Sequence, residues 1–433
     1  MKTLFKMLFG RKNIKKRNFD LNPEKNKNPY NKDSDYNNEY YKLVIKGVLS
    51  KKKAFVGPEE VHIDLTNMCN NNCIGCWCNS PFLGELKMSP EVQKQTLTFS
   101  ILKKTIDELA NLGTKRIKLI GGGEPTLHPN FMEVVEYITR KGMECWINTN
   151  LLEINEELVK RIVSAGVKLI DVSLWASNPK TYVKTQTIRK EADFLRIKKT
   201  LKSFYHEKKE QNKDSPIIRI YNVIFNMNYS EIEQMINFAL DVHADKVQFV
   251  FLEPITKKTE FLLIDEEQRG ELKEIVKRIK KNIFRIEGSD DVYRDEKGRE
   301  IMITDFTKNF IRRLEQSDVI KGVYDEFVVN EIPCYVGWVF ARIMADGSVI
   351  PCLKAHKMPM GNIYKNSFSN IWNSKKYQNF RKMCMTYKKK HSYFKNIGND
   401  PNYGCAKICD NLWQNELIQK KLIENKINIP KLK

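Results

Sequence analysis

Three cysteines close together in the sequence could hold a metal centre. Cys69, Cys73 and Cys76 have the spacing C-x3-C-x2-C and directly follow a short apolar run typical of a strand. Three thiolates can bind three irons of a cubane cluster, which leaves the fourth iron open to a small ligand. A structural zinc site usually has four protein ligands or paired C-x2-C knuckles. The spacing therefore favours a [4Fe–4S] cluster with one open iron over zinc.

A glycine-rich segment follows the second predicted strand and reads Gly121-Gly122-Gly123-Glu124-Pro125. Glycine lets the backbone approach a ligand because no Cβ stands in the way. No Lys-Ser or Lys-Thr follows, as a phosphate-binding loop would require. The backbone carbonyls and the Glu124 carboxylate could instead accept hydrogen bonds from an ammonium group. We therefore expect this loop to bind a ligand with an amino-acid portion.

A second group of cysteines lies towards the C-terminus, and its members are Cys334, Cys352, Cys384, Cys405 and Cys409. Cys352 ends a Gly347-x4-Cys run, and Cys405 and Cys409 have the spacing C-x3-C. Clustered cysteines in a long chain without a signal peptide indicate metal ligands rather than a disulfide framework. This second cysteine group predicts another metal centre, for which a zinc ribbon is the alternative to an iron–sulfur cluster.

The elements that must position these residues alternate between strands and helices, which is typical of a parallel α/β sheet. No G-x-G-x-x-G follows the first strand, so the pattern favours a partial (β/α)6 barrel like that of a TIM barrel over a Rossmann fold. The predicted strands are 61–65, 116–120, 144–148, 168–173, 217–225 and 246–252. The predicted helices are 99–112, 129–141, 155–165, 192–207, 230–242 and 265–281, and three of them are followed by glycines that would end them: Gly113, Gly142 and Gly166.

Composition changes along the chain predict five segments. Residues 1–57 form a basic, largely flexible leader, and residues 58–282 form the partial barrel. A charged connector follows at 283–325, a smaller domain with the second cysteine group at 326–415, and a basic tail at 416–433.

The chain is strongly basic, with 74 Lys and Arg against 53 Asp and Glu and a net charge of +21. No nucleic-acid-binding motif accompanies this charge, so we expect a solvated basic surface and no specific nucleic-acid partner. No apolar run is long enough to span a membrane. The first 17 residues could make weak contact with an anionic membrane surface as a short amphipathic helix. Free clustered cysteines indicate a reducing, cytoplasmic compartment and low oxygen.

The first cysteine triple and the glycine loop together resemble those of the radical S-adenosylmethionine (SAM) superfamily over roughly residues 60–255. The resemblance implies that Cys69, Cys73 and Cys76 hold the cluster, and that Gly122, Gly123 and Glu124 bind the amino group of SAM. It also places Ser173, at the end of the fourth strand, near the ribose or carboxylate of SAM. Relatives usually have a bulky residue before the third cysteine, where this chain has Gly75. Cys78 then acts beside the cluster or in packing, not as a fourth ligand.

The second cysteine group, with its Gly-Asn-Ile and Ile-Trp segments, resembles the SPASM/Twitch extension of that superfamily. The full extension has seven cysteines and two clusters, whereas this region has five cysteines. The resemblance therefore implies the shorter form, with one auxiliary [4Fe–4S] cluster on Cys334, Cys352, Cys405 and Cys409. Cys384 is left as a substitute ligand, a catalytic thiol or a packing residue.

The resemblance implies a radical SAM enzyme that forms a 5′-deoxyadenosyl radical and removes a hydrogen atom from a substrate. An auxiliary cluster favours oxidation of a sugar, a peptide or another small metabolite, with a flavodoxin or ferredoxin as electron donor. A redox-neutral epimerase is an alternative and would need a thiol such as Cys384 or Cys78 to return hydrogen. Peptide or protein maturation is another alternative, although no N-terminal winged-helix domain for a leader peptide is evident. A non-catalytic iron–sulfur electron carrier or scaffold is the alternative of another class, but it would not need the Gly-Gly-Gly-Glu loop.

Overall fold

The computed structural model describes residues 38–287, 290–398, 400, 402–429 and 432–433. The chain divides into two compact units, residues 1–42 and 43–433. Most of the first unit, including the N-terminal segment expected at a membrane surface, lies outside the described residues. Within the described parts of the chain, no helix has both the length and the apolar character needed to cross a membrane.

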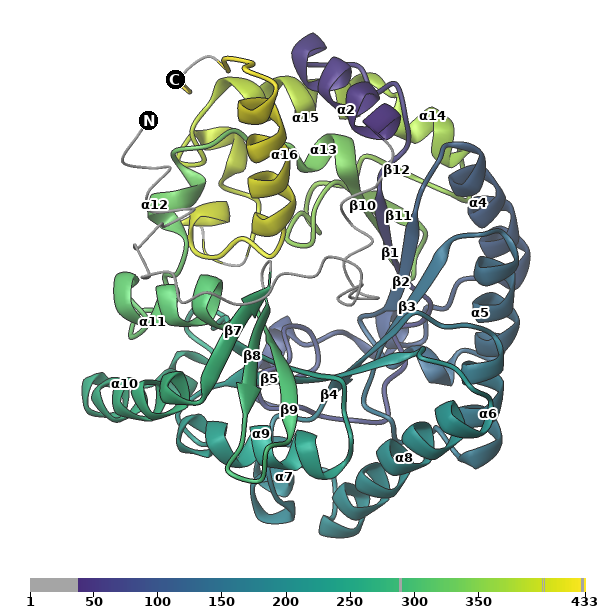
Figure 1. Cartoon of the computed structure of the whole chain (residues 1–433). Helices are drawn as coiled ribbons and strands as arrows, with labels where there is room; N and C mark the ends of the chain where they lie inside the picture. The colour runs from purple at the N-terminus through teal and green to yellow at the C-terminus, as the bar shows by residue number, and fades with distance from the viewer. Residues whose placement is uncertain (1–37, 288–289, 399, 401, 430–431) are drawn as a thin grey trace, which may run out of the picture. The chain divides into compact units, whose positions relative to one another are not determined.

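One sheet forms the centre of the second unit (Figure 1), with the strand order β12-β11-β10-β1-β2-β3-β4-β5-β6-β9-β8-β7. Strands β1 to β6 pair in parallel with their sequence neighbours, as the partial barrel requires. Their bounds agree within one residue with the six predicted strands. They are β1 (Glu60–Asp64), β2 (Arg116–Ile120), β3 (Glu144–Thr149), β4 (Leu169–Ser173), β5 (Ile217–Ile224) and β6 (Lys246–Phe251).

Helices connect these strands and cover their outer side (Figure 1). They bury aliphatic residues against the sheet, as amphipathic helices of α/β proteins do. Gly113, Gly142 and Gly166 have φ values of +84°, +75° and +74°, so each adopts the left-handed conformation that ends a helix. The helices are α4 (Phe99–Asn111), α5 (Phe131–Arg140), α6 (Glu156–Ser164), α8 (Glu191–Glu210), α9 (Ile232–Asp241) and α10 (Glu266–Lys281), with the shorter α3 (Pro90–Gln93) and α7 (Pro179–Thr185) in loops after β1 and β4.

The segment 283–325, which the sequence suggested as a charged connector, extends the sheet instead. It contains β7 (Ile283–Glu287), β8 (Asp290–Arg294) and β9 (Glu300–Thr304), and β9 pairs in parallel with β6. Ile301 and Ile303 are buried, whereas Arg294 and Glu300 form an exposed ion pair. Charged residues such as Arg294 and Glu300 alternate with the buried residues of this hairpin and conceal its apolar pattern in the sequence.

The opposite edge of the sheet is supplied by the C-terminal region. Its strands are β10 (Phe340–Ile343), β11 (Ser348–Ile350) and β12 (Gly361–Asn362), and β10 pairs in parallel with β1. The parallel part of the described sheet therefore has eight strands, two more than expected. The helices of this region are α11 (Arg312–Gln316), α12 (Glu326–Val329), α13 (Val336–Val339), α14 (Phe368–Trp372), α15 (Lys375–Thr386) and α16 (Leu412–Glu424).

Two segments expected to be loose are packed instead. The end of the predicted leader is held by two indole groups: Trp338 donates to the Lys53 carbonyl over 2.8 Å, and Trp372 donates to the Val56 carbonyl over 3.0 Å. A buried indole N–H needs an acceptor, and these two carbonyls supply it. The start of the predicted tail lies in α16, where the side chains of Ile418 and Leu422 are fully buried.

The inner face of the barrel is polar. Asp171 on β4 is fully buried and lies 2.6 Å from Lys118 on β2, and it also makes a two-point ion pair with Arg219 on β5 at 2.5 and 2.9 Å. Side chains of parallel strands alternate between the two faces of the sheet, so the outer face packs the core while the inner face lines the interior. The carboxyl ends of these strands lie above this charged layer and carry the loops of the candidate site.

Candidate active site and auxiliary cluster site

The first cysteine group, Cys69, Cys73 and Cys76, lies on the loop after β1. Cys73 forms an isolated β-bridge with Gln186, and the Cys76 N–H donates to the Cys73 carbonyl over 3.1 Å. The three thiols are close enough for each to influence the pKa of another. Burial raises the pKa of Cys69 to about 12, whereas a hydrogen bond from Cys78 lowers that of Cys76 to about 7. The structure therefore brings the three predicted ligands together.

Cys78 lies next to Cys76 of this group. Its side chain is buried, with its sulfur 3.6 Å from the sulfur of Cys76 and 3.2 Å from the carbonyl oxygen of Gly122. Its thiol therefore lies between a predicted cluster ligand and a predicted SAM-binding carbonyl. This position agrees with a role beside the cluster.

The glycine loop after β2 packs tightly against the cysteine loop. The Glu124 N–H donates to the Met68 carbonyl over 2.8 Å, and the Gly123 N–H donates to the Thr66 carbonyl over 3.2 Å. A Cβ on Gly123 would lie far inside van der Waals contact of the Met68 carbonyl. Glycine is needed here because the two loops approach each other through their backbones.

Glu124 is 3% exposed, and its carboxylate is anchored by neighbouring loops. Oε1 accepts from the hydroxyls of Thr149 at 2.6 Å and Thr126 at 2.8 Å, and Oε2 accepts from the Asn150 N–H at 2.8 Å. Burial raises the pKa of Glu124, although these hydrogen bonds oppose the shift. A carboxylate has about four acceptor positions, and Oε2 accepts one described hydrogen bond. Glu124 can therefore join the loops after β2 and β3 and still accept a ligand's ammonium group.

Further polar groups lie near the ends of β3 and β4. Ser173 is partly exposed, and Asn148 donates to its hydroxyl over 3.4 Å. Trp175 has a φ of +63° and its ring lies beside Gly75, where a Cβ would be 3.5 Å from the indole. The indole from the loop after β4 therefore lies beside the small residue at position 75. A positive φ on a tryptophan is a strained conformation that is often found at functional sites.

The residues present fit the expected cofactors. No three His, Cys, Asp or Glu side chains of the described residues converge as a single metal ion would require. A cubane differs, because each thiolate binds a separate iron. On and near the loops, the buried polar atoms without a hydrogen-bond partner among the described residues include Asn67 Oδ1, Trp175 Nε1 and Asn222 Nδ2. Such atoms are rare in proteins and suit a place where a polar ligand binds.

The second cysteine group lines one cavity of the C-terminal region. All five members, Cys384 included, contribute to its wall. The Cys384 thiol hydrogen-bonds the Cys334 sulfur, which lowers the pKa of Cys334 to about 6, and Lys389 acts in the same direction. Burial raises the pKa of Cys405 to about 12 and that of Cys352 further. The four predicted ligands are therefore brought together, and the thiol expected to be spare lies with them.

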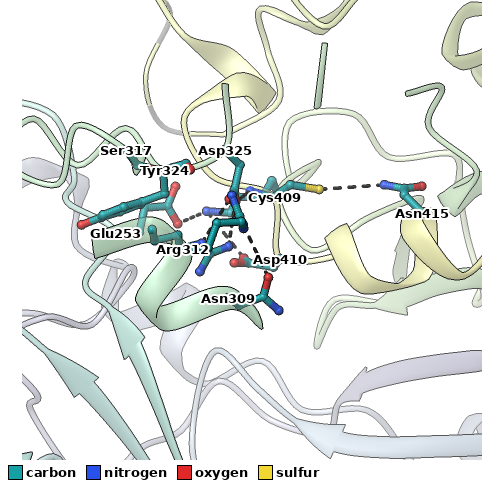
Figure 2. A network of polar contacts seen from close by, with 11 residues as sticks. Glu253, Asn309, Arg312, Ser317, Tyr324, Asp325, Cys409, Asp410 and Asn415 are labelled. Atoms are coloured by element: carbon teal, nitrogen blue, oxygen red, sulfur yellow. Dashed lines mark hydrogen bonds and ion pairs between the residues drawn. The ribbon is translucent and has the colours of Figure 1, made fainter. Parts of the chain in front are cut away.

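A buried carboxylate holds the segment that carries Cys409 (Figure 2). Asp325 is fully buried and accepts from the Cys409 N–H over 3.0 Å. Arg313 donates to both carboxylate oxygens at 3.1 and 2.7 Å, and Arg312 adds a third contact at 3.0 Å. These charges outweigh the effect of burial and hold the pKa of Asp325 below its usual range. The neighbouring Asn415 amide lies 3.9 Å from the Cys409 sulfur.

Sequence reasoning did not identify Asp325, Thr149 or Trp175 as parts of these sites. Asp325 is remote in sequence from Cys409 and has no motif around it. The position of Thr149 at the end of a strand beside the glycine loop was a usable signal, because carboxyl ends of parallel strands meet at one edge. A glycine at position 75, where relatives usually have a bulky residue, leaves space for a large side chain from another loop, and Trp175 lies there.

Two sequence profiles match the chain. The radical SAM superfamily profile covers residues 63–239, and the profile of the iron–sulfur cluster-binding SPASM domain covers residues 334–400. The chain is 23% identical over 347 residues to the tungsten-containing aldehyde ferredoxin oxidoreductase cofactor-modifying protein of Pyrococcus furiosus. This alignment covers 76% of this chain and 84% of that protein. It is 24% identical over 336 residues to the antilisterial bacteriocin subtilosin biosynthesis protein AlbA of Bacillus subtilis. That alignment covers 75% of this chain and 62% of AlbA.

A solved structure supports the same fold. Streptococcus suis SuiB bound to the precursor peptide SuiA aligns with a TM-score of 0.56 and 16% identity, over 84% of this chain and 74% of that one. With both profiles in the expected order, the chain belongs to the radical SAM superfamily, binds that family's [4Fe–4S] cluster and SAM, and carries a C-terminal SPASM domain for auxiliary iron–sulfur binding.

Proposed function

We propose that this enzyme cleaves SAM reductively and oxidises a substrate held at the carboxyl ends of the barrel strands. Cys69, Cys73 and Cys76 hold the first cluster. The carbonyls of Gly122 and Gly123 and the carboxylate of Glu124 bind the amino group of SAM, and Ser173 contacts its ribose or carboxylate. The tight packing of the glycine loop on the cysteine loop supports this assignment.

When bound, the first cluster and SAM supply a 5′-deoxyadenosyl radical, and an auxiliary cluster with four protein ligands supplies a one-electron acceptor. The substrate would lose one hydrogen atom to the 5′-carbon, one electron to that acceptor and one proton to a base. The product is therefore two hydrogens lighter. The barrel residues orient the substrate, and the loops exclude water from it.

The second cysteine group carries the oxidative part of the proposal. Its five thiols line one cavity, which is more than the four that a cubane needs. We assign Cys334, Cys352, Cys405 and Cys409 as ligands and Cys384 as a donor to the Cys334 sulfur. With all four irons bound to protein, this cluster has no free position for a substrate and is suited to electron transfer.

Epimerisation is less well supported. It requires a thiol that can reach the substrate radical and return a hydrogen atom. Cys78 and Cys384, the two candidates, are both buried, and each is hydrogen-bonded to a predicted cluster ligand. These positions suit roles beside the clusters.

For the substrate we propose a peptide or a cofactor precursor. One relative is a cofactor-modifying protein, another takes part in bacteriocin biosynthesis, and one structural neighbour is bound to a precursor peptide. These relatives and this structural neighbour favour the maturation of a peptide or cofactor over the oxidation of a sugar. A cytoplasmic flavodoxin or ferredoxin would supply the first electron.

Formation of 5′-deoxyadenosine tests the first part of the proposal. Anaerobically reconstituted protein is incubated with SAM and dithionite, and the nucleoside is measured by mass spectrometry. The wild type and Cys352→Ala should both release it, because Cys352 belongs to the second group. The triple variant Cys69→Ala, Cys73→Ala, Cys76→Ala should release none. Release by the triple variant, or none by the wild type, would reject the assignment.

A further inference from the structure

One buried lysine in the wall of the second cysteine cavity has no counter-ion among the residues that the structure describes. The described residues include four buried lysines, Lys208, Lys354, Lys389 and Lys407. Three of them are paired: Lys208 with Asp245 at 2.8 Å, Lys407 with Asp400 at 3.0 Å, and Lys354 with Glu253. Lys389 is 4% exposed, and its Nζ has no hydrogen-bond partner. An isolated buried ammonium group is costly, so its retention calls for a compensating anion.

The local fold directs Lys389 inward. It follows α15, and its neighbours Lys388 and Lys390 are both exposed. The His391 N–H donates to the Lys388 carbonyl over 3.0 Å and closes a turn around Lys389. Its Nζ lies 5.3 Å from the centre of the Phe394 ring, and both residues line the cavity. A contact with an aromatic ring is weaker than a carboxylate pair and does not neutralise the charge.

Five cysteine sulfurs line the same cavity as Lys389, together with the Asp410 carboxylate, which lies 3.5 Å from Lys354. Lys389 lines this cavity together with Cys334, Cys384 and Cys405, and its positive charge favours their thiolate forms, which opposes the rise in pKa that burial causes in Cys384 and Cys405. Lys354 lines the same cavity, but Glu253 and Asp410 already engage it. Of the two buried lysines in this wall, Lys389 is therefore the one without a carboxylate partner among the described residues, and its charge can act on the cysteine sulfurs.

We propose that Lys389 is the electrostatic partner of the auxiliary cluster and raises its reduction potential. A cubane on four thiolates is negatively charged and gains one more negative charge on reduction, so a fixed cation nearby stabilises the reduced state more. This inference rests on the proposed auxiliary site. It gives the chain a residue that sets how readily that site accepts an electron.

The test uses full-length protein that carries Cys69→Ala, Cys73→Ala and Cys76→Ala, so that only the auxiliary cluster is present. Lys389→Met removes the charge and keeps an apolar stem, and Lys388→Met makes the same change in net charge on the exposed neighbour. Iron content and the midpoint potential, from a redox titration followed by electron paramagnetic resonance, are the readouts. The midpoint potential of Lys389→Met should be about 59 mV lower than that of the parent, which for one electron is about a tenfold shift towards the oxidised state. Lys388→Met should match the parent.

Other results have defined meanings. A Lys389→Met protein with full iron and the parent's potential would overturn the inference and leave the proposed function intact. If this variant folds but holds no iron, Lys389→Arg decides: restored iron supports a need for the positive charge, and no restoration overturns it. If the parent itself binds no iron, the auxiliary site is wrong, and the inference fails with it.

Discussion

Arg342 on β10 and Asp64 on β1 form a two-point ion pair in which Nε lies 2.9 Å from Oδ1 and Nη2 lies 2.9 Å from Oδ2. Asp64 is the last residue of β1, just before the loop with the first cysteine group. The Arg342 guanidinium also lies 5.4 Å from the centre of the Trp77 ring on that loop. The strand between Cys334 and Cys352 of the second cysteine group is thus tied to the start of the loop that carries the first group.

Removal of this pair should destabilise the protein. Arg342→Met leaves Asp64 buried without a partner, which costs about 3–5 kcal/mol. Urea unfolding under anaerobic conditions, followed by circular dichroism, measures the change. The exposed pair of Arg294 and Glu300 offers a control, because Arg294→Met should cost less than about 1 kcal/mol. Equal effects of the two changes would contradict the role of the buried pair.

Glu124→Gln should weaken SAM binding without unfolding the loop. The amide keeps the shape of the side chain but loses the negative charge, which is worth about 1.5–3 kcal/mol to a hydrogen bond with an ammonium group. Equilibrium dialysis of radiolabelled SAM with reconstituted protein gives the affinity. Glu153→Gln is the control, because Glu153 is exposed and contacts Asn70 on the cysteine loop. Unchanged affinity in Glu124→Gln would reject the assignment.

Trp175→Phe should also weaken SAM binding, by a smaller amount. The change keeps an aromatic ring beside Gly75 but removes the buried indole N–H, which has no partner among the described residues. A lost hydrogen bond to the ligand would cost about 0.5–1.5 kcal/mol. The same dialysis experiment applies. Full affinity in this variant would mean that the indole N–H does not contact SAM.

Cys384→Ala should retain the auxiliary iron if Cys384 is a donor and not a ligand. The variant loses the hydrogen bond to Cys334, so the cluster should be present with an altered potential. Cys145→Ala is a matched control, because Cys145 is equally buried but lies in β3. Iron analysis separates the outcomes: loss of iron in Cys384→Ala alone would make Cys384 a ligand in place of one of the assigned four.

Asp171→Asn should destabilise the protein most at neutral pH. Burial alone would raise the pKa of Asp171, but Arg219 and Lys118 outweigh it and hold the pKa well below its usual range. A carboxylate with a depressed pKa contributes stability above its unfolded pKa of about 3.9 and loses that contribution as the pH falls further. The unfolding free energies of wild type and variant should therefore differ by the same amount at pH 7 and pH 5, and this difference should shrink as the pH falls from about 4 towards about 2. A constant difference over this range would contradict the ion-pair explanation.

The sequence predicted the six central strands and the grouping of the cysteines because both depend on local patterns. Alternating apolar residues and C′ glycines such as Gly113 fix elements from nearby residues alone. The pairing of β9 with β6 and β10 with β1 was not predictable, because it depends on distant segments. The same holds for Asp325, whose contact with Cys409 arises only when its own segment folds against the cysteine loop. Lys389 sits between two exposed lysines, and nothing in the sequence separates it from them.

The pairing of β1 with β10 also has a consequence for the order in which the protein can mature. Arg342 follows Asp64 by 278 positions, so a ribosome that has delivered the first six strands has left one edge of β1 without its neighbour. Contacts between such distant residues form late because the intervening loop must close first. The loop with Cys69 is therefore supported on both sides only after the chain through β10 has been synthesised. Insertion of the first cluster into its final surroundings must wait for translation to reach the second cysteine group.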